Sequence, residues 1–151
     1  FLGIYNVLAL RGDPIKTENA FKAHPRGHRF ASELIHQVND MNEGKYCVDD
    51  IKMAPTDFCI GAAGYPEKHF EAMNLKTDLI HLKKKVEAGA SYIVTQMFFD
   101  NQKYFAFVQA CLDFGIDVPI IPGIKPIRSL NHITFLECFK TQWRIFCPLR
   151  R

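Results

Sequence analysis

Charged residues directly follow the first apolar segment of this chain, where a binding site is expected. Arg11 and Asp13 flank Gly12 after the apolar run 4–10. Glycine lets the backbone approach a ligand closely, and arginine can hold a phosphate or carboxylate with two parallel hydrogen bonds. The three residues therefore suit an anion or cofactor site, and a strand-end turn with an exposed ion pair is the alternative. The tripeptide is too short to indicate cell adhesion.

Two further apolar runs end in side chains that suit a ligand. Tyr65 and His69 follow the run 58–63, and the tyrosine ring either contacts a flat ligand or packs at the rim of the sheet. Gln96 interrupts the run 92–98, and an unpaired buried amide costs about 1–3 kcal/mol. The amide must bond to neighbouring backbone or to a ligand, and its place at the end of a strand favours the ligand.

The helical pattern 77–88 carries a polar flank. Asp78, His81 and Lys85 recur on one side of it, because successive residues turn by 100°. Lys85 is therefore predicted to reach a ligand phosphate beside the sheet, whereas Lys84 projects towards solvent. A charged surface without a ligand is the alternative. The apolar stripe of the same helix is predicted to contain Leu75, Leu79, Leu82 and Val86.

Strands and helices in alternation must position these residues. Apolar runs predict strands over 4–10, 58–63, 92–98 and 118–121. Helical periods predict helices over 30–41 and 77–88, and a third that is capped by Asp100 and ends at Gly115. All four strands are expected to be buried on both faces, as in a parallel α/β sheet. A part of a (β/α)8 barrel and an open doubly wound sheet both fit, although no G-x-G-x-x-G motif follows any strand.

The composition is that of a globular protein. Of the 151 residues, 48% are hydrophobic and 23% charged, and the net charge of +3 is too small and scattered to predict nucleic-acid binding. No apolar run is long enough to span a bilayer. The five cysteines include no C-x-x-C pair, so we expect a reducing, cytoplasmic setting, with Cys59 and Cys111 buried. No metal site is predicted, because His24 and His28 flank a proline and a glycine.

Longer motifs resemble those of one enzyme family, 5,10-methylenetetrahydrofolate reductase, in its bacterial form. The motifs are NVLALRGD at 6–13, AGYPEKH at 63–69, LKKKV at 82–86, TQMFFD at 95–100 and IPGI at 121–124. The resemblance runs from Phe1 to about Ile127. It implies a partial (β/α)8 TIM barrel of about four βα units, strands four to seven, with residues 1–127 as part of a catalytic domain.

The resemblance also implies a set of site residues. Asp13 would lie near the flavin and the folate and tune the charge there. Gln96 and Tyr104 match positions that bind the folate, and Gln96 also meets the nicotinamide. The residues that match FAD contacts of the family are Arg11, Gly12, Asp13, Ala31, Ala63, Tyr65, His69, Asp78, Lys84 and Lys85.

The reaction implied by the resemblance is a reduction. NADH or NADPH gives a hydride to FAD, and the reduced flavin passes it to 5,10-methylenetetrahydrofolate, which becomes 5-methyltetrahydrofolate. The chain would then belong to an oxidoreductase of one-carbon metabolism and methionine biosynthesis. We expect it in the cytoplasm, as a homo-oligomer in its full-length form, with neither nucleic acid nor a membrane as a partner.

The resemblance covers only part of the family's barrel. The general-acid glutamate of the first strand would lie before Phe1, so the isolated chain is expected to be inactive in the folate step. After Ile127 the resemblance fades, and 128–151 is expected to be a divergent tail, truncated or out of frame. Two alternatives stay open: a non-catalytic flavin- or folate-binding half-barrel that needs a complementing chain, and a plain α/β structural domain.

Overall fold

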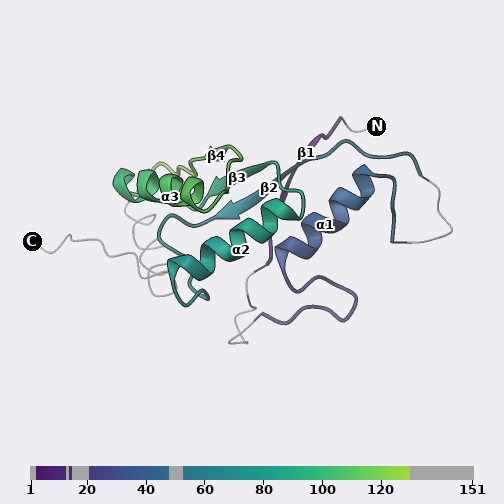
Figure 1. The fold of residues 1–151 in the computed structure, drawn as a ribbon, viewed down its shortest axis with the longest axis horizontal. Helices are drawn as coiled ribbons and strands as arrows, with labels where there is room; N and C mark the ends of the chain where they lie inside the picture. The colour runs from purple at the N-terminus through teal and green to yellow at the C-terminus, as the bar shows by residue number, and fades with distance from the viewer. Residues whose placement is uncertain (1–2, 13, 15–20, 48–52, 130–151) are drawn as a thin grey trace, which may run out of the picture.

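Helices and parallel strands alternate along the computed structural model of the chain, which describes residues 3–12, 14, 21–47 and 53–129 (Figure 1). This alternation confirms the predicted α/β class. Within the described residues the elements are β1 (Asn6–Ala9), α1 (Ala31–Asn42), β2 (Cys59–Gly64), α2 (Leu75–Glu87), β3 (Tyr92–Thr95), α3 (Asn101–Asp113) and β4 (Ile120–Ile121).

The strands lie side by side in the order in which they occur along the chain. β1 pairs with β2, β2 with β3 and β3 with β4, always in parallel. A doubly wound sheet reverses its strand order at a switch point, whereas a (β/α)8 barrel keeps the order of the chain. The described strands contain no such reversal, and their order is consistent with a segment of a (β/α)8 barrel.

All three described helices pack on the same face of this sheet. Ala9, Ala62, Ile93 and Ile120 share one row of the strand register and so project from one face. One core cluster joins this face to α2 and α3 through Leu79, Leu82, Ile93, Phe107, Cys111 and Ile116. A second cluster joins it to α1 through Ala9, Ile35, Ile60, Ala62 and Ala90.

On the opposite face of the sheet two predictions are wrong: that all four strands are buried on both faces, and that Cys59 is buried. Leu8 is 42% and Ile121 46% exposed, so β1 and β4 are not buried on both faces. Cys59 is also exposed, whereas Cys111 is buried as predicted. Leu8, Ile121 and Cys59 all project away from the helices, because alternate residues of a strand face opposite sides. The large buried side chains of this sheet therefore project from the face that the helices cover.

Capping residues set the helix ends. The Asp100 carboxylate accepts a hydrogen bond from the backbone N–H of Gln102 at 2.9 Å, which confirms the predicted cap. Asn74 caps α2 through the backbone N–H of Thr77 at 2.9 Å, so this helix begins earlier than predicted. Leu75 occupies the first position of α2, ahead of the turns that pack on the sheet, and is 40% exposed. It therefore does not belong to the apolar stripe.

None of the described helices has the length and apolar character needed to cross a membrane.

Candidate functional site

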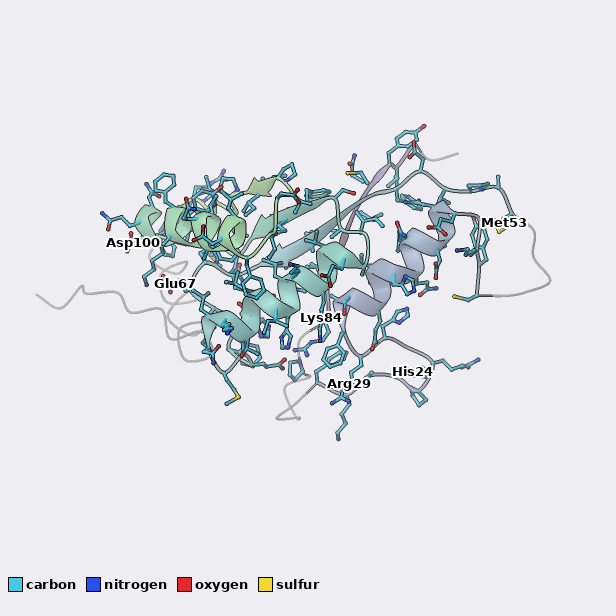
Figure 2. All side chains as sticks on the ribbon, in the orientation of Figure 1. His24, Arg29, Met53, Glu67, Lys84 and Asp100 are labelled. Carbon is cyan, nitrogen blue, oxygen red and sulfur yellow. The ribbon has the colours of Figure 1, made fainter. Side chains whose placement is uncertain are left out.

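A cavity of about 460 Å³ opens where β1 and β2 end. Its walls come from the residues after these strands, the start of α1, the loop 65–72 and one flank of α2. In a parallel α/β protein the carboxyl ends of the strands are where ligands bind. Lys84 projects from α2 on the side that lies next to α1 (Figure 2).

Most of the residues predicted to contact a cofactor meet at this cavity. His81, on the predicted polar flank of α2, also lines it, and Gly12 does not. Asp13 lies outside the described residues, so its predicted charge-tuning role stays a prediction. The predicted contacts that line the cavity are Arg11, Ala31, Ala63, Tyr65, His69, Asp78, Lys84 and Lys85.

Asp78 anchors the loop that carries His69. Its carboxylate accepts a hydrogen bond from the backbone N–H of His69 at 2.8 Å, and Asp78 is only 8% exposed. The first turn of α2 places it there, where a negative charge also interacts favourably with the helix dipole. The polar flank predicted from the sequence therefore begins with a residue that fixes a neighbouring loop.

The imidazole of His69 contacts two aromatic rings and accepts one hydrogen bond, and it stacks on Phe70 with the centroids 4.7 Å apart. Its ring meets the Tyr65 ring edge-on, with the centroids 4.6 Å apart, and its Nδ1 accepts a hydrogen bond from the backbone N–H of Glu71 at 3.2 Å. A ring nitrogen that accepts carries no proton, so the neutral ring is protonated at Nε2. Burial lowers the pKa of His69, against the raising effect of the negative charges of Glu71 and Asp78. The neutral form therefore dominates at neutral pH.

Lys85 brings a positive charge to the end of the sheet. Its Nζ donates a hydrogen bond to the backbone oxygen of Ala63 at 2.9 Å and lies 5.7 Å from the centre of the Tyr65 ring. Burial lowers the pKa of Lys85, while the carboxylate of Asp78 opposes that shift. An ammonium has three N–H donors, and only one is needed for Ala63. Lys85 can therefore hold an anion while it stays bonded to the sheet.

Arg11 is paired with a residue that no sequence pattern singles out. Its Nη2 donates to Oε1 of Glu71 at 2.7 Å, and its guanidinium carbon lies 5.0 Å over the ring of Phe21. The hydrogen bond from Arg11 lowers the pKa of Glu71. Sixty residues separate the ion-paired side chains. Local spacing cannot mark such a pair, because only the β1–β2 pairing brings it together.

The two residues that match folate positions lie away from this cavity. The amide oxygen of Gln96 accepts a hydrogen bond from the backbone N–H of Met97 at 3.0 Å, which is the backbone alternative for that atom. The hydroxyl of Tyr104 donates to the backbone oxygen of Ile120 at 2.9 Å, and its ring stacks on Phe98 with the centroids 4.9 Å apart. Neither residue lines the cavity.

The donor set around the cavity suits an anionic ligand with a flat ring. Arg11, Lys84 and Lys85 supply positive charge, and Tyr65 supplies an aromatic ring. Ala31 and Ala63 have small side chains and leave space between these groups. Within the ranges that the structure describes, no group of three or more His, Cys, Asp and Glu side chains could hold a metal ion.

Comparison with known proteins gives one consistent result. The family model described as methylenetetrahydrofolate reductase matches residues 1–145, a range that extends past Ile127. The chain is 42% identical over 144 residues to "Methylenetetrahydrofolate reductase (NADH) 1" of Arabidopsis thaliana, covering 89% of this chain and 22% of that protein. It is 39% identical over 127 residues to "Methylenetetrahydrofolate reductase 1" of Schizosaccharomyces pombe, covering 84% and 19%.

A bacterial relative matches at a similar level. The "5,10-methylenetetrahydrofolate reductase" of Escherichia coli is 38% identical over 130 residues, which cover 86% of this chain and 37% of that protein. The chain thus spans about a fifth of the plant and yeast relatives and just over a third of the bacterial one.

Proposed function

The chain belongs to the methylenetetrahydrofolate reductase family, a family of oxidoreductases, and we propose that it forms the part of the barrel that holds FAD. The protein would use NADH or NADPH to reduce 5,10-methylenetetrahydrofolate to 5-methyltetrahydrofolate. The name of the Arabidopsis thaliana relative specifies NADH, and that of a Caenorhabditis elegans relative specifies NADPH. The observation that carries the proposal is the cavity itself, where eight residues that match FAD contacts converge.

The chemistry of the cavity supports FAD as the ligand. Positive charge on Arg11, Lys84 and Lys85 suits a diphosphate, and Arg11 can offer two parallel N–H bonds. The edge-on pair of Tyr65 and His69 presents aromatic surface to a flat ring system. Bound FAD supplies the hydride transfer, and the protein supplies binding, orientation and electrostatics.

The residues of the chain would share this work. Asp78 holds the loop of His69 in place, and the neutral imidazole adds no charge to the cavity wall. Lys85 balances anionic charge next to the sheet. In the same proposal Gln96 and Tyr104 contact the folate and Asp13 tunes the charge between folate and flavin.

The remaining features of the proposal follow from the family. Residues 1–127 would be part of the barrel, and of the predicted tail 128–151 the structure describes only 128 and 129. The protein would act in the cytoplasm, as a homo-oligomer, in one-carbon metabolism.

Titration of the protein with FAD tests the proposal. We expect Lys85→Met to raise the dissociation constant about tenfold, equivalent to about 1.4 kcal/mol, because a phosphate loses its charged partner. Lys103→Met is the matched control, since Lys103 pairs with Glu67 at 2.7 Å and does not line the cavity. Wild-type protein that does not quench flavin fluorescence on mixing would overturn the proposal, and equal effects of the two lysine variants would remove Lys85 from the site.

A further inference from the structure

We infer that Glu71 is a positioning residue of the cofactor cavity, which holds the Arg11 guanidinium in the orientation that meets the ligand's phosphates. The inference rests on the proposed function, because it concerns the ligand of the same cavity. Both residues line that cavity, and they approach it from different segments: Arg11 follows β1, whereas Glu71 lies between β2 and α2.

The guanidinium of Arg11 is restrained from two directions. Nη2 donates to Oε1 of Glu71 at 2.7 Å, and the ring of Phe21 lies 5.0 Å from the guanidinium carbon. The Arg11 side chain is consequently only 20% exposed although it lies at the wall of a cavity. A guanidinium has five N–H donors, so one bond to Glu71 leaves others for a phosphate.

Restraint of this kind raises affinity because it is completed before the ligand arrives. A free arginine side chain samples many rotamers and loses that freedom when it binds a phosphate. Where Glu71 has already fixed the side chain, this entropic cost no longer opposes binding. Glu71 also supplies negative charge to a cavity wall that carries both Arg11 and Lys85. The pKa of Lys85 is lowered mainly by burial and, to a smaller extent, by the positive charge of Arg11.

Repulsion between Glu71 and an incoming phosphate is the opposing effect. The Glu71 side chain is 39% exposed, so water screens its charge from groups farther away. Arg11 neutralises it further through the direct bond at 2.7 Å. Water weakens the repulsion between Glu71 and a phosphate, but it does not weaken the restraint that Glu71 places on the Arg11 side chain. We therefore expect loss of Glu71 to weaken the binding of FAD.

Glu67 provides a matched control within the same loop. It pairs with Lys103 at 2.7 Å, as Glu71 pairs with Arg11, but it does not line the cavity. Figure 2 shows Glu67 well apart from Lys84, which marks the cavity on α2. Glu67→Gln and Glu71→Gln therefore remove the same charge from one loop, and only the second change affects the cavity wall.

The experiment measures the dissociation constant of FAD for the protein and its variants. We expect Glu71→Gln to raise it about 3- to 10-fold, as the loss of one ordered side chain predicts. Glu67→Gln is expected to stay within about twofold. Glu71→Asp keeps the charge but is one methylene shorter, and it should give an intermediate loss. It also supplies the same test if Glu71→Gln does not fold.

A double substitution separates positioning from a merely structural role. In an Arg11→Met background, Glu71→Gln is expected to change the dissociation constant less than about twofold, because Glu71 acts through Arg11. An undiminished effect in that background would show that Glu71 supports the fold instead and would overturn the inference. If the wild-type protein binds FAD and the Glu71→Gln variant binds it equally well or more tightly, the inference is overturned while the proposed function stands. No FAD binding by the wild-type protein would overturn the proposed function and the inference with it.

Discussion

Replacing Asp78 by alanine removes the acceptor that anchors the loop of His69. The bond is 2.8 Å long, and at 8% exposure the carboxylate is little screened by solvent. A hydrogen bond to a charged group contributes about 1.5–3 kcal/mol, and a carboxylate in the first turn of a helix adds about 0.3–1 kcal/mol. We therefore expect Asp78→Ala to lower the free energy of unfolding by about 2–4 kcal/mol.

Urea unfolding measures this loss directly, and two variants control it. Asp78→Asn keeps an oxygen acceptor without the charge, so it should lose about half as much. Asp113→Ala removes an exposed carboxylate, with its surface hydrogen bond from Gln109, from the end of α3 and should change the free energy of unfolding by less than about 0.5 kcal/mol. The midpoint of thermal unfolding should fall as well, by roughly 2–4 °C for each kcal/mol lost from the free energy of unfolding.

Hydrogen exchange at one amide locates the effect. The backbone N–H of His69 is the donor to Asp78, so its exchange should accelerate in Asp78→Ala more than that of amides in α3. FAD binding should weaken as well, because His69 lines the cavity. A variant that unfolds within about 0.5 kcal/mol of the wild type, with unchanged exchange at His69, would refute the idea that this bond holds the loop.

Three further predictions concern other parts of the described structure. Gly61→Ala should destabilise the protein by about 1–3 kcal/mol in urea, because its Cβ would lie 2.4 Å from the Tyr92 ring; a smaller cost after Tyr92→Ala would support this cause. The pKa of His69 is lowered from 6.5 by burial, so its contribution to stability is present above pH 6.5 and is lost as pH falls through the lowered value. His69→Gln should therefore lose less thermal stability on acidification than the wild type, and parallel curves would contradict the assignment. Burial raises the pKa of Cys111 to about 12, so iodoacetamide should label exposed Cys59 in the native protein and Cys111 only after unfolding, as peptide mapping would detect.

Local spacing explains which features could be predicted from the amino-acid sequence. Asp78, His81 and Lys85 share the cavity flank of α2 because residues three and four apart lie on one face of any helix. The cap at Asp100 and the alternation of strands with helices are equally local features, and the structure confirms both. The family's motifs were likewise present in the sequence, and the family match over residues 1–145 confirms the resemblance.

Pairing between residues far apart in the chain explains which features could not be predicted from the amino-acid sequence. Whether Cys59 is buried depends on which face of the sheet the helices cover, and an apolar run alone does not reveal that face. The pairing of Arg11 with Glu71 has the same origin, because the two residues lie sixty positions apart in the chain.

The amino-acid sequence by itself determined the type of each element, the polar flank of α2 and the family, because these depend on residue identity and spacing along the chain. Only the tertiary structure decided that all described helices cover one face of a sheet with sequential strands, and that Glu71 meets Arg11. The physical reason is that strand register brings together residues far apart in the chain, and their side chains carry no local mark of that pairing.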